Sequence, residues 1–231
     1  MKTLGIIGGI APASTIEYYR LIISLYRERK PDGNYPPIII NSINLKKMLD
    51  LVGAGKLTEL TGYMLDEVKK LAQAGADFGF IASNTPHIVF DEIQRLSPIP
   101  LISIVEAACG AAKKLGVQTV GLFGTRSTMQ GKFYPEVFSK QGITVIAPDP
   151  DDLTYIHDKY MGELVNAVFL DETRNRLLTI ADKLKEKKGI DALILGGTEL
   201  PLILTDPGKT GIPFLDTTRI HVGRIVERML E

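Results

Sequence analysis

Three short polar segments carry the side chains best suited to acid–base chemistry on a small carboxylic acid. Ser83-Asn84-Thr85-Pro86-His87 and Gly196-Gly197-Thr198-Glu199 each follow an apolar run. Asn and Thr supply neutral donors and acceptors that can hold a small carboxylate. Gly124-Thr125-Arg126-Ser127-Thr128 adds hydroxyls and backbone amides at an expected helix start, where anions bind well. These segments predict a binding site for a small carboxylate ligand.

Each segment also has a purely structural interpretation. Asn, Thr and Pro are common where helices begin, so residues 84–86 could form a cap. His87 is expected to be structural or solvent-facing rather than an acid–base group. Arg126 could pair with a substrate carboxylate or remain an exposed cation. Glu199 could orient another group or simply complement a helix dipole.

Gly8-Gly9 follows the first apolar run in a G-x-x-G-G pattern, which differs from the G-x-G-x-x-G of dinucleotide sites. Asn41-Ser42 stands after the second run, where an acidic ribose ligand would be needed. We therefore expect a tight turn whose amides line the carboxylate site, and no dinucleotide cofactor. The alternative is a turn with a purely structural role, in which glycine allows the backbone to pack closely against its neighbours.

An internal repeat relates these segments to one another. Residues 3–9 resemble residues 119–125, residues 76–85 resemble residues 190–199, and residues 99–102 resemble residues 212–215. The three offsets are 116, 114 and 113 residues, so the blocks keep one order and nearly one spacing. Two such halves can pack about a pseudo-two-fold axis, with their strand-end loops facing one crevice. That geometry would suit a reaction that needs one group on each face of a substrate.

Short apolar runs alternate with amphipathic segments, which predicts an α/β fold with parallel sheets and right-handed crossovers. Strands are expected at residues 4–7, 37–41, 78–82, 101–104, 119–123, 143–146, 192–195 and 214–215. Helices are expected at residues 14–29, 57–74, 90–96, 104–115, 128–141, 153–169, 171–188 and 217–230. The predicted first lobe is residues 1–98 plus 213–231, and the second is residues 99–212.

Composition narrows the class of protein. The 27 acidic and 27 basic residues cancel, which disfavours a nucleic-acid partner. No apolar run reaches the length of a membrane span, and the chain enters a strand pattern at once, leaving no room for a signal peptide. The single Cys109 is expected to be a small buried residue, and a cytoplasmic location is expected. His87, His157 and His221 are far apart in sequence, so no metal site is expected.

These motifs together resemble the aspartate/glutamate racemase family, and most of all its amino-acid racemases of broad or unknown substrate. The resemblance spans essentially the whole chain: Gly5-Ile6-Ile7-Gly8-Gly9, residues 84–87, residues 124–129, Gly196-x-Thr198-Glu199-Leu200 and Ile220-His221. It implies two flavodoxin-like lobes, a crevice between them and often a homodimer. It also implies chemistry without pyridoxal phosphate or metal, carried by two acid–base residues, typically cysteines, on opposite faces of the substrate α-carbon.

The chain departs from that pattern where the thiols would stand, immediately before Asn84 and immediately before Thr198. Ser83 and Gly197 occupy these positions. Some relatives carry Thr or Ala at the first position and keep the second cysteine. A serine hydroxyl is a much weaker acid than a thiol, and glycine cannot move a proton. Either the natural protein lacks the thiols or Gly197 replaces a cysteine. In the second case, restoring Cys should restore racemisation.

The resemblance and the motifs predict a cofactor-independent racemase for aspartate, glutamate or a related small amino acid. Ser83 is the remaining proton-transfer candidate, and Gly197 is the vacated catalytic position. The substrate-binding candidates are Asn84, Thr85, Thr125, Ser127, Thr128 and Thr198. The alternative is a non-catalytic protein that binds a small carboxylate on the same scaffold. A related lyase or isomerase is a weaker alternative, because those enzymes also depend on cysteine.

Overall fold

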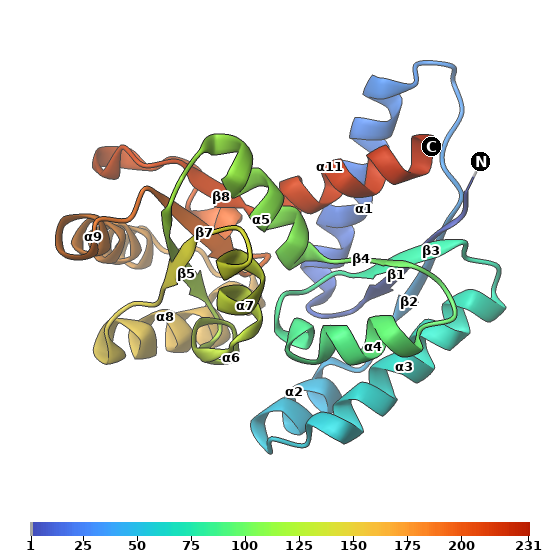
Figure 1. Ribbon diagram of the computed structural model, residues 1–231, viewed down its shortest axis with the longest axis horizontal. Coiled ribbons are helices and arrows are strands. Elements are labelled where there is room, and N and C mark those ends of the chain that lie inside the picture. The colour runs from blue at the N-terminus through green and yellow to red at the C-terminus, as the bar shows by residue number, and fades with distance from the viewer. Residues whose placement is uncertain (1) are drawn as a thin grey trace. The chain divides into compact units, whose positions relative to one another are not determined.

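The computed structural model describes residues 2–231 and divides the chain into two compact units (Figure 1). Unit 1 runs as far as Ile104 and also takes in His221–Glu231, whereas unit 2 is Val105–Ile220. Each unit contains one four-stranded sheet, and every strand pair in both sheets is parallel. The predicted α/β class with parallel sheets is therefore confirmed.

The sheet of unit 1 has the strand order β2-β1-β3-β4. Its strands are β1 (Leu4–Gly8), β2 (Ile38–Ser42), β3 (Phe78–Ile81) and β4 (Leu101–Ile102). Strands β1 and β3 are buried along their whole length, because helices cover both faces of the sheet. The register pairs Ile7 with Ile81, so the chain leaves these two neighbouring strands at the same edge.

Helices lie on both faces of this sheet (Figure 1), and an apolar cluster fills the space on each face. The helices of one face are α2 (Leu45–Gly53), α3 (Leu57–Gln73) and α4 (Phe90–Leu96). Helix α3 buries Met64 and Val68 against Ile7 and Ile81. Helices α1 (Pro12–Arg29) and α11 (Thr217–Leu230) cover the other face, where residues such as Ile22 and Val226 pack with Phe80.

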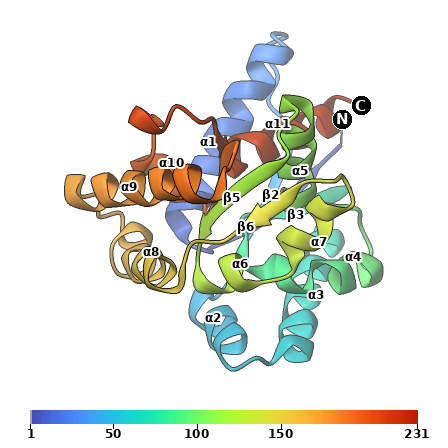
Figure 2. The ribbon, with the colours of Figure 1, turned by 60° about the vertical axis from the view of Figure 1, so that its left-hand side comes forward.

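Unit 2 repeats this topology, with the strand order β6-β5-β7-β8. Its strands are β5 (Thr119–Gly124), β6 (Thr144–Ile146), β7 (Ala192–Gly196) and β8 (Phe214–Asp216). Its helices are α5 (Ile104–Leu115), α6 (Arg126–Gln130), α7 (Phe133–Ser139), α8 (Pro150–Gly162), α9 (Asp171–Lys188) and α10 (Leu200–Ile203). Helix α8 packs beside α6 and α9 (Figure 2). The shared order 2-1-3-4 is the flavodoxin-like one.

The repeat extends to how neighbouring strands are joined. In unit 1, Asp77 Oδ2 accepts a hydrogen bond of 2.6 Å from the Thr3 amide. In unit 2, Asp191 Oδ2 accepts bonds of 2.8 Å from the Thr119 amide and 2.9 Å from the Gln118 amide. In each unit, an aspartate just before the third strand (β3 or β7) therefore accepts a hydrogen bond from the backbone at the start of the first strand (β1 or β5).

All eight predicted strands are present, and the predicted bounds of α4, α5, α9 and α11 match the structure. The single helix predicted at 128–141 is wrong. Gly131 is extended (φ −70°, ψ 153°) and separates α6 from α7. The helix predicted at 153–169 begins earlier, at Pro150, and α8 ends at Gly162, followed by a 3-10 turn at Leu164–Asn166. Two short helices, α2 and α10, were not predicted.

The unit boundaries also differ from the predicted lobes, which divided the chain after residues 98 and 212. Those divisions would separate β4 and β8 from the sheets in which they pair. Strand β4 pairs with β3, and β8 pairs with β7, so the chain passes from one unit to the other only after each of these edge strands.

No helix among residues 2–231 is long and apolar enough to cross a membrane.

Candidate functional site

The predicted site residues of unit 1 follow β3 at the carboxyl edge of the sheet, where ligands of open parallel sheets bind. Ser83, Asn84 and Thr85 are all buried. Asn84 precedes a 3-10 helix at Thr85–Val89 that has Pro86 in its first turn. These three side chains lie beside the end of β1, because β3 pairs with β1 and the loop after β3 leads directly into this helix.

Gly8 and Gly9 form a close-packed turn at the end of β1. Gly9 has φ +83°, and a β-carbon there would lie 2.6 Å from the carbonyl oxygen of Ile43. A β-carbon on Gly8 would lie 2.8 Å from Thr15 Oγ1, and that hydroxyl accepts a 2.8 Å bond from the Gly9 amide. The prediction that the amides of this turn line a carboxylate site is therefore wrong for Gly9. The alternative interpretation is the one that fits: the turn is tight, and its backbone packs closely against neighbouring atoms.

His87 is a buried structural residue. Its Nε2 atom accepts a bond of 3.3 Å from the Ile104 amide, and its ring stacks on Phe90 with centroids 4.6 Å apart. Burial lowers the pKa of His87 to about 4, against the opposing effect of the backbone at Ser83 and Asn84. Because Nε2 accepts, the neutral ring carries its proton on Nδ1. His87 therefore has no free lone pair to act as the base for Ser83.

In unit 2, the candidates lie at the carboxyl edge of β5 and β7, where Gly124 pairs with Gly196. Thr125 caps α6, since its Oγ1 accepts a 3.3 Å bond from the Thr128 amide and lies 3.1 Å from Thr128 Oγ1. Thr125 and Thr128 are buried, and Ser127 is half-buried. The hydroxyls predicted to bind substrate are thus gathered at one end of this sheet.

Arg126 contacts α8. Its amide donates a 3.1 Å bond to His157 Nδ1, and its Nη2 donates a 3.4 Å bond to Thr154 Oγ1. Burial, followed by the charge of Arg126, lowers the pKa of His157. The Arg126 amide is therefore already bonded within the protein.

Tyr160 fills the space beside Gly197. A β-carbon built on Gly197 would lie 2.8 Å from both Cζ and Oη of Tyr160, and nearer still to Cε2. The backbone of Gly197 lies outside the left-handed region, so its conformation does not require glycine. The ring from α8 is what excludes a side chain. The expectation that Cys at 197 alone restores activity meets this obstacle, because a thiol needs the volume that Tyr160 occupies.

Glu199 connects Tyr160 to the polar loop. Its Oε2 atom accepts hydrogen bonds from the Tyr160 hydroxyl and, at 3.0 Å, from the Thr198 hydroxyl. Its Oε1 atom is buried and has no hydrogen-bond partner among residues 2–231. Burial raises the pKa of Glu199, and burial together with the nearby Glu199 charge raises the pKa of Tyr160. Of the two sequence interpretations of Glu199, this geometry fits the one in which it orients another group.

Sequence reasoning missed Tyr160 and Thr15. Both lie in helices at positions that their local sequence does not distinguish from ordinary core positions. Their contacts with Gly197 and Gly9 arise only when a helix packs across the end of a strand. A glycine where a related protein has a side chain is the one signal in the sequence, and it does not name the residue that fills the space.

The structure brings each unit's candidates together. Unit 1 places Ser83, Asn84 and Thr85 on one loop, and unit 2 places Thr125, Ser127, Thr128, Gly197 and Thr198 around the ends of β5 and β7. No group of three His, Cys, Asp or Glu side chains within residues 2–231 is arranged to hold a metal ion. Cys109 is buried, as predicted, with burial raising its pKa.

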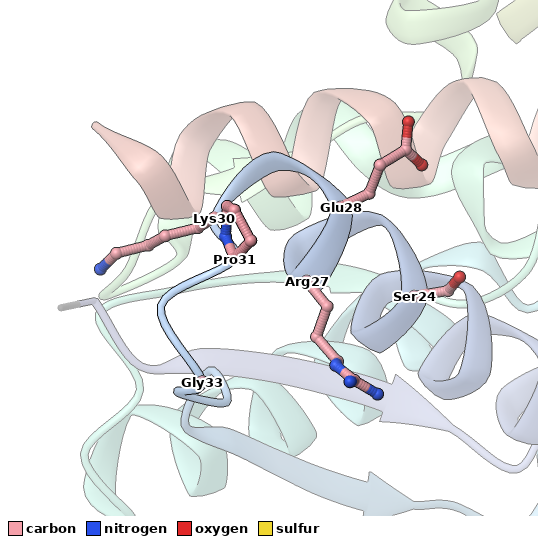
Figure 3. Close-up of a pocket in the computed structure, with 6 residues that line it drawn as sticks. All are labelled: Ser24, Arg27, Glu28, Lys30, Pro31 and Gly33. Atoms are coloured by element: carbon pink, nitrogen blue, oxygen red, sulfur yellow. The ribbon is translucent and has the colours of Figure 1, made fainter.

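A surface pocket of about 540 Å³ lies elsewhere, at the end of α1 (Figure 3). It is lined by Ser24, Arg27, Glu28, Lys30, Pro31 and Gly33. Helix α1 starts beyond the carboxyl end of β1 and returns the chain to the amino end of β2. The pocket is therefore at the opposite edge of the sheet from Ser83.

Known proteins resemble the chain along nearly its full length. The family described as Asp/Glu/Hydantoin racemase matches residues 7–225. The broad specificity amino-acid racemase RacX of Bacillus subtilis is 25% identical over 222 residues, which are 93% of this chain and 92% of that protein. A Yersinia pestis protein considered to be an Asp/Glu racemase has a TM-score of 0.90 and 30% identity. An aspartate racemase homologue from Pyrococcus horikoshii has a TM-score of 0.84 and 33% identity. Each of these two structural matches covers 100% of both chains.

Proposed function

The chain belongs to the Asp/Glu/Hydantoin racemase family, and on that premise we propose that it interconverts the enantiomers of a small amino acid by proton transfer at the α-carbon. Aspartate, glutamate or a related amino acid is the proposed substrate. The observation that carries the proposal is the pair of equivalent loops, Ser83-Asn84-Thr85 and Gly197-Thr198-Glu199, at the same place in two units of the same topology.

In the proposed reaction, neutral hydroxyl and amide groups hold the substrate while one group on each face exchanges the α-proton. The carboxylate-binding side chains are Asn84, Thr85, Thr125, Ser127, Thr128 and Thr198. Ser83 is the proposed proton-transfer residue of unit 1. The reaction needs neither pyridoxal phosphate nor a metal, because the proton moves directly between the α-carbon and protein groups.

Incubation in heavy water tests this proposal. The protein is mixed separately with the L and D forms of aspartate, glutamate, asparagine and alanine, and NMR follows loss of the α-proton while chiral chromatography follows the enantiomers. We expect both exchange and interconversion for at least one amino acid. Ser83→Ala should abolish interconversion, whereas Ser139→Ala, which alters an exposed serine at the end of α7, should not.

A second candidate function is supported by Gly197 itself, which has no side chain to move a proton. A protein that only binds a small carboxylate would keep the Asn and Thr hydrogen-bonding groups. It would give saturable heat of binding with aspartate or glutamate in calorimetry and no deuterium at the α-carbon. Exchange of the α-proton would rule this function out.

The proposal includes a homodimer and a cytoplasmic location, as the family resemblance and the composition suggest. Ile16 and Tyr19 leave 70% and 46% of their surfaces exposed on neighbouring turns of α1, so this part of α1 is the surface that we propose for the dimer contact. Sedimentation equilibrium of the protein and of Ile16→Lys tests the assembly. A dimer that Ile16→Lys dissociates would support it, and a monomer at all concentrations would oppose it.

A further inference from the structure

The Tyr160 hydroxyl lies directly against the position where a side chain at residue 197 would begin. Oη is 2.8 Å from the position of a β-carbon on Gly197, and Tyr160 is almost entirely buried. Gly197 follows β7 directly, at the carboxyl edge of the sheet, beside Thr198. The missing side chain therefore leaves no empty volume. The ring and hydroxyl of Tyr160, from α8, occupy the space next to Gly197.

Glu199 makes this hydroxyl part of a proton-accepting pair. The Tyr160 hydroxyl donates to Oε2 of Glu199, and Thr198 supports the same oxygen at 3.0 Å. Oε1 is buried without a hydrogen-bond partner in the described part of the chain. A buried carboxylate oxygen without a partner is costly, and such exceptions call for a functional explanation. The unpartnered oxygen makes the carboxylate a better proton acceptor than one fully satisfied by donors.

We propose that Tyr160, backed by Glu199, is the proton-transfer residue of unit 2 in place of the thiol that residue 197 cannot supply. This inference rests on the proposed racemase function. In one direction the substrate Cα–H bond breaks and its electron pair stays on the substrate as an enolate. The α-proton bonds to Tyr160 Oη while the hydroxyl's own proton passes to Glu199 Oε2. In the other direction Glu199 starts protonated, and it gives its proton to the Tyr160 oxygen as the Tyr160 hydroxyl gives its own proton to the α-carbon of the enolate.

The electrostatics agree with these roles. Burial and the neighbouring carboxylate raise the pKa of Tyr160 well above its usual value, so the hydroxyl keeps its proton at neutral pH. Burial also raises the pKa of Glu199, which makes its carboxylate a stronger base than a solvated one. General acid–base groups of this kind contribute about 100-fold to 10,000-fold in rate.

Tyr160→Phe tests the inference because it removes only the hydroxyl and keeps the ring packed against Gly197. We expect racemisation to fall about 100-fold or more, with α-proton exchange lost from one enantiomer and retained from the other. Tyr134→Phe is the matched control, since Tyr134 is a fully buried tyrosine of α7 in the same unit. Its racemisation rate should stay within about threefold of wild type, well below the effect of losing an acid–base group.

Glu199→Gln provides a second variant that leaves Tyr160 intact. Gln can still accept the Tyr160 hydrogen bond but cannot take its proton. We expect kcat to fall by a similar factor, KM to change little, and the acidic limb of the pH profile of kcat to disappear. A raised KM with an unchanged pH profile would show that Glu199 has only a structural role and would overturn the relay.

The possible results distinguish a failure of this inference from a failure of the proposed racemase function. Wild-type protein that exchanges no α-proton with any amino acid of the panel would overturn the racemase function and the inference together. Wild-type protein that racemises a substrate, with Tyr160→Phe equally active, would overturn the inference alone. An equal loss of exchange from both enantiomers in Tyr160→Phe would also overturn it, because a single-face acid–base group affects the two directions differently.

Discussion

The side chain of Tyr160 occupies the space that a side chain on Gly197 would need. Its ring atom Cζ and its hydroxyl oxygen are each 2.8 Å from the position of a β-carbon on residue 197. Tyr160 lies in helix α8, and Gly197 directly follows β7. Any side chain at residue 197 requires Tyr160 to move. A protein in which cysteine had simply been replaced by glycine would have an empty space beside residue 197, whereas here Tyr160 fills that space.

Gly197→Ala should therefore destabilise the protein. Adding one methyl group to this packed site is expected to cost about 1–3 kcal/mol of unfolding free energy, measured by urea denaturation. The cost should largely disappear in a Tyr160→Ala background, which opens the space. Gly110→Ala is the control, because nothing lies within 4 Å of a β-carbon at that helical glycine. Equal stability of the Gly197→Ala and Gly110→Ala variants would contradict this packing relationship.

Gly9→Ala should cost more than Gly33→Ala. Both glycines have a left-handed backbone, with φ of +83° and +82°, so both substitutions carry similar strain of about 1 kcal/mol. Only Gly9 adds a collision, because its β-carbon would meet the Ile43 carbonyl oxygen at 2.6 Å, whereas Gly33 has open space. The difference between the two urea-unfolding free energies measures that collision, and no difference would mean the turn relaxes freely.

Asp191→Asn should destabilise unit 2 in a pH-dependent way. Hydrogen bonds from the amides of Thr119 and Gln118 lower the pKa of Asp191. Its charged form is thus favoured in the folded state, and its contribution is present above the unfolded pKa of about 3.9 and lost as the pH falls through the lower folded value. The stability gap between wild type and Asp191→Asn should be full at pH 7 and shrink below about pH 4. A gap that persists unchanged to pH 2.5 would exclude this origin.

Two buried histidines should make the protein less stable in mild acid. Burial lowers the pKa of His221 to about 3 and that of His87 to about 4. The unfolded chain, with histidine pKa values near 6.5, binds more protons than the folded chain between these limits. Unfolding free energy should therefore fall by up to about 1.4 kcal/mol per pH unit per histidine as the pH drops from 6.5 towards 5. A flat stability profile across that range would contradict the neutral, buried state of both rings.

His221→Gln isolates one of the two contributions. His221 Nδ1 lies 3.0 Å from the Tyr18 hydroxyl, and Nε2 lies 3.0 Å from the Ile102 carbonyl oxygen. Gln can make similar hydrogen bonds but does not titrate. The variant should therefore show a shallower decline in unfolding free energy between pH 6.5 and 5 than wild type, even if it is less stable at pH 7.

The strands were predictable because their burial leaves a simple pattern. Strand β7, for example, is buried along its whole length and appears in sequence as a short continuous apolar run. Helix α2 was missed because it is only nine residues long and fully buries only Met48. The break between α6 and α7 depends on the extended backbone of Gly131, and an isolated glycine does not by itself reveal its conformation.

The candidate site was predictable where it is local in sequence. Ser83, Asn84 and Thr85 follow directly from the end of a strand, and parallel topology fixes which edge of the sheet they occupy. The contact between Tyr160 and Gly197 was not predictable. It joins residues 37 positions apart through the packing of α8 on the end of β7, and no periodicity records such a contact.

Unit 2 is inserted within unit 1, and this affects the order in which the molecule can be completed. The part of helix α11 from His221 onward packs with Ile22 and Tyr26 of α1, yet it follows all of unit 2 in the chain (Figure 1). A ribosome would release the four strands of unit 1 long before Val226 and Met229 emerged to cover that apolar face. The apolar face of α1 would therefore stay uncovered throughout synthesis of unit 2, and the unit that starts first would be completed last.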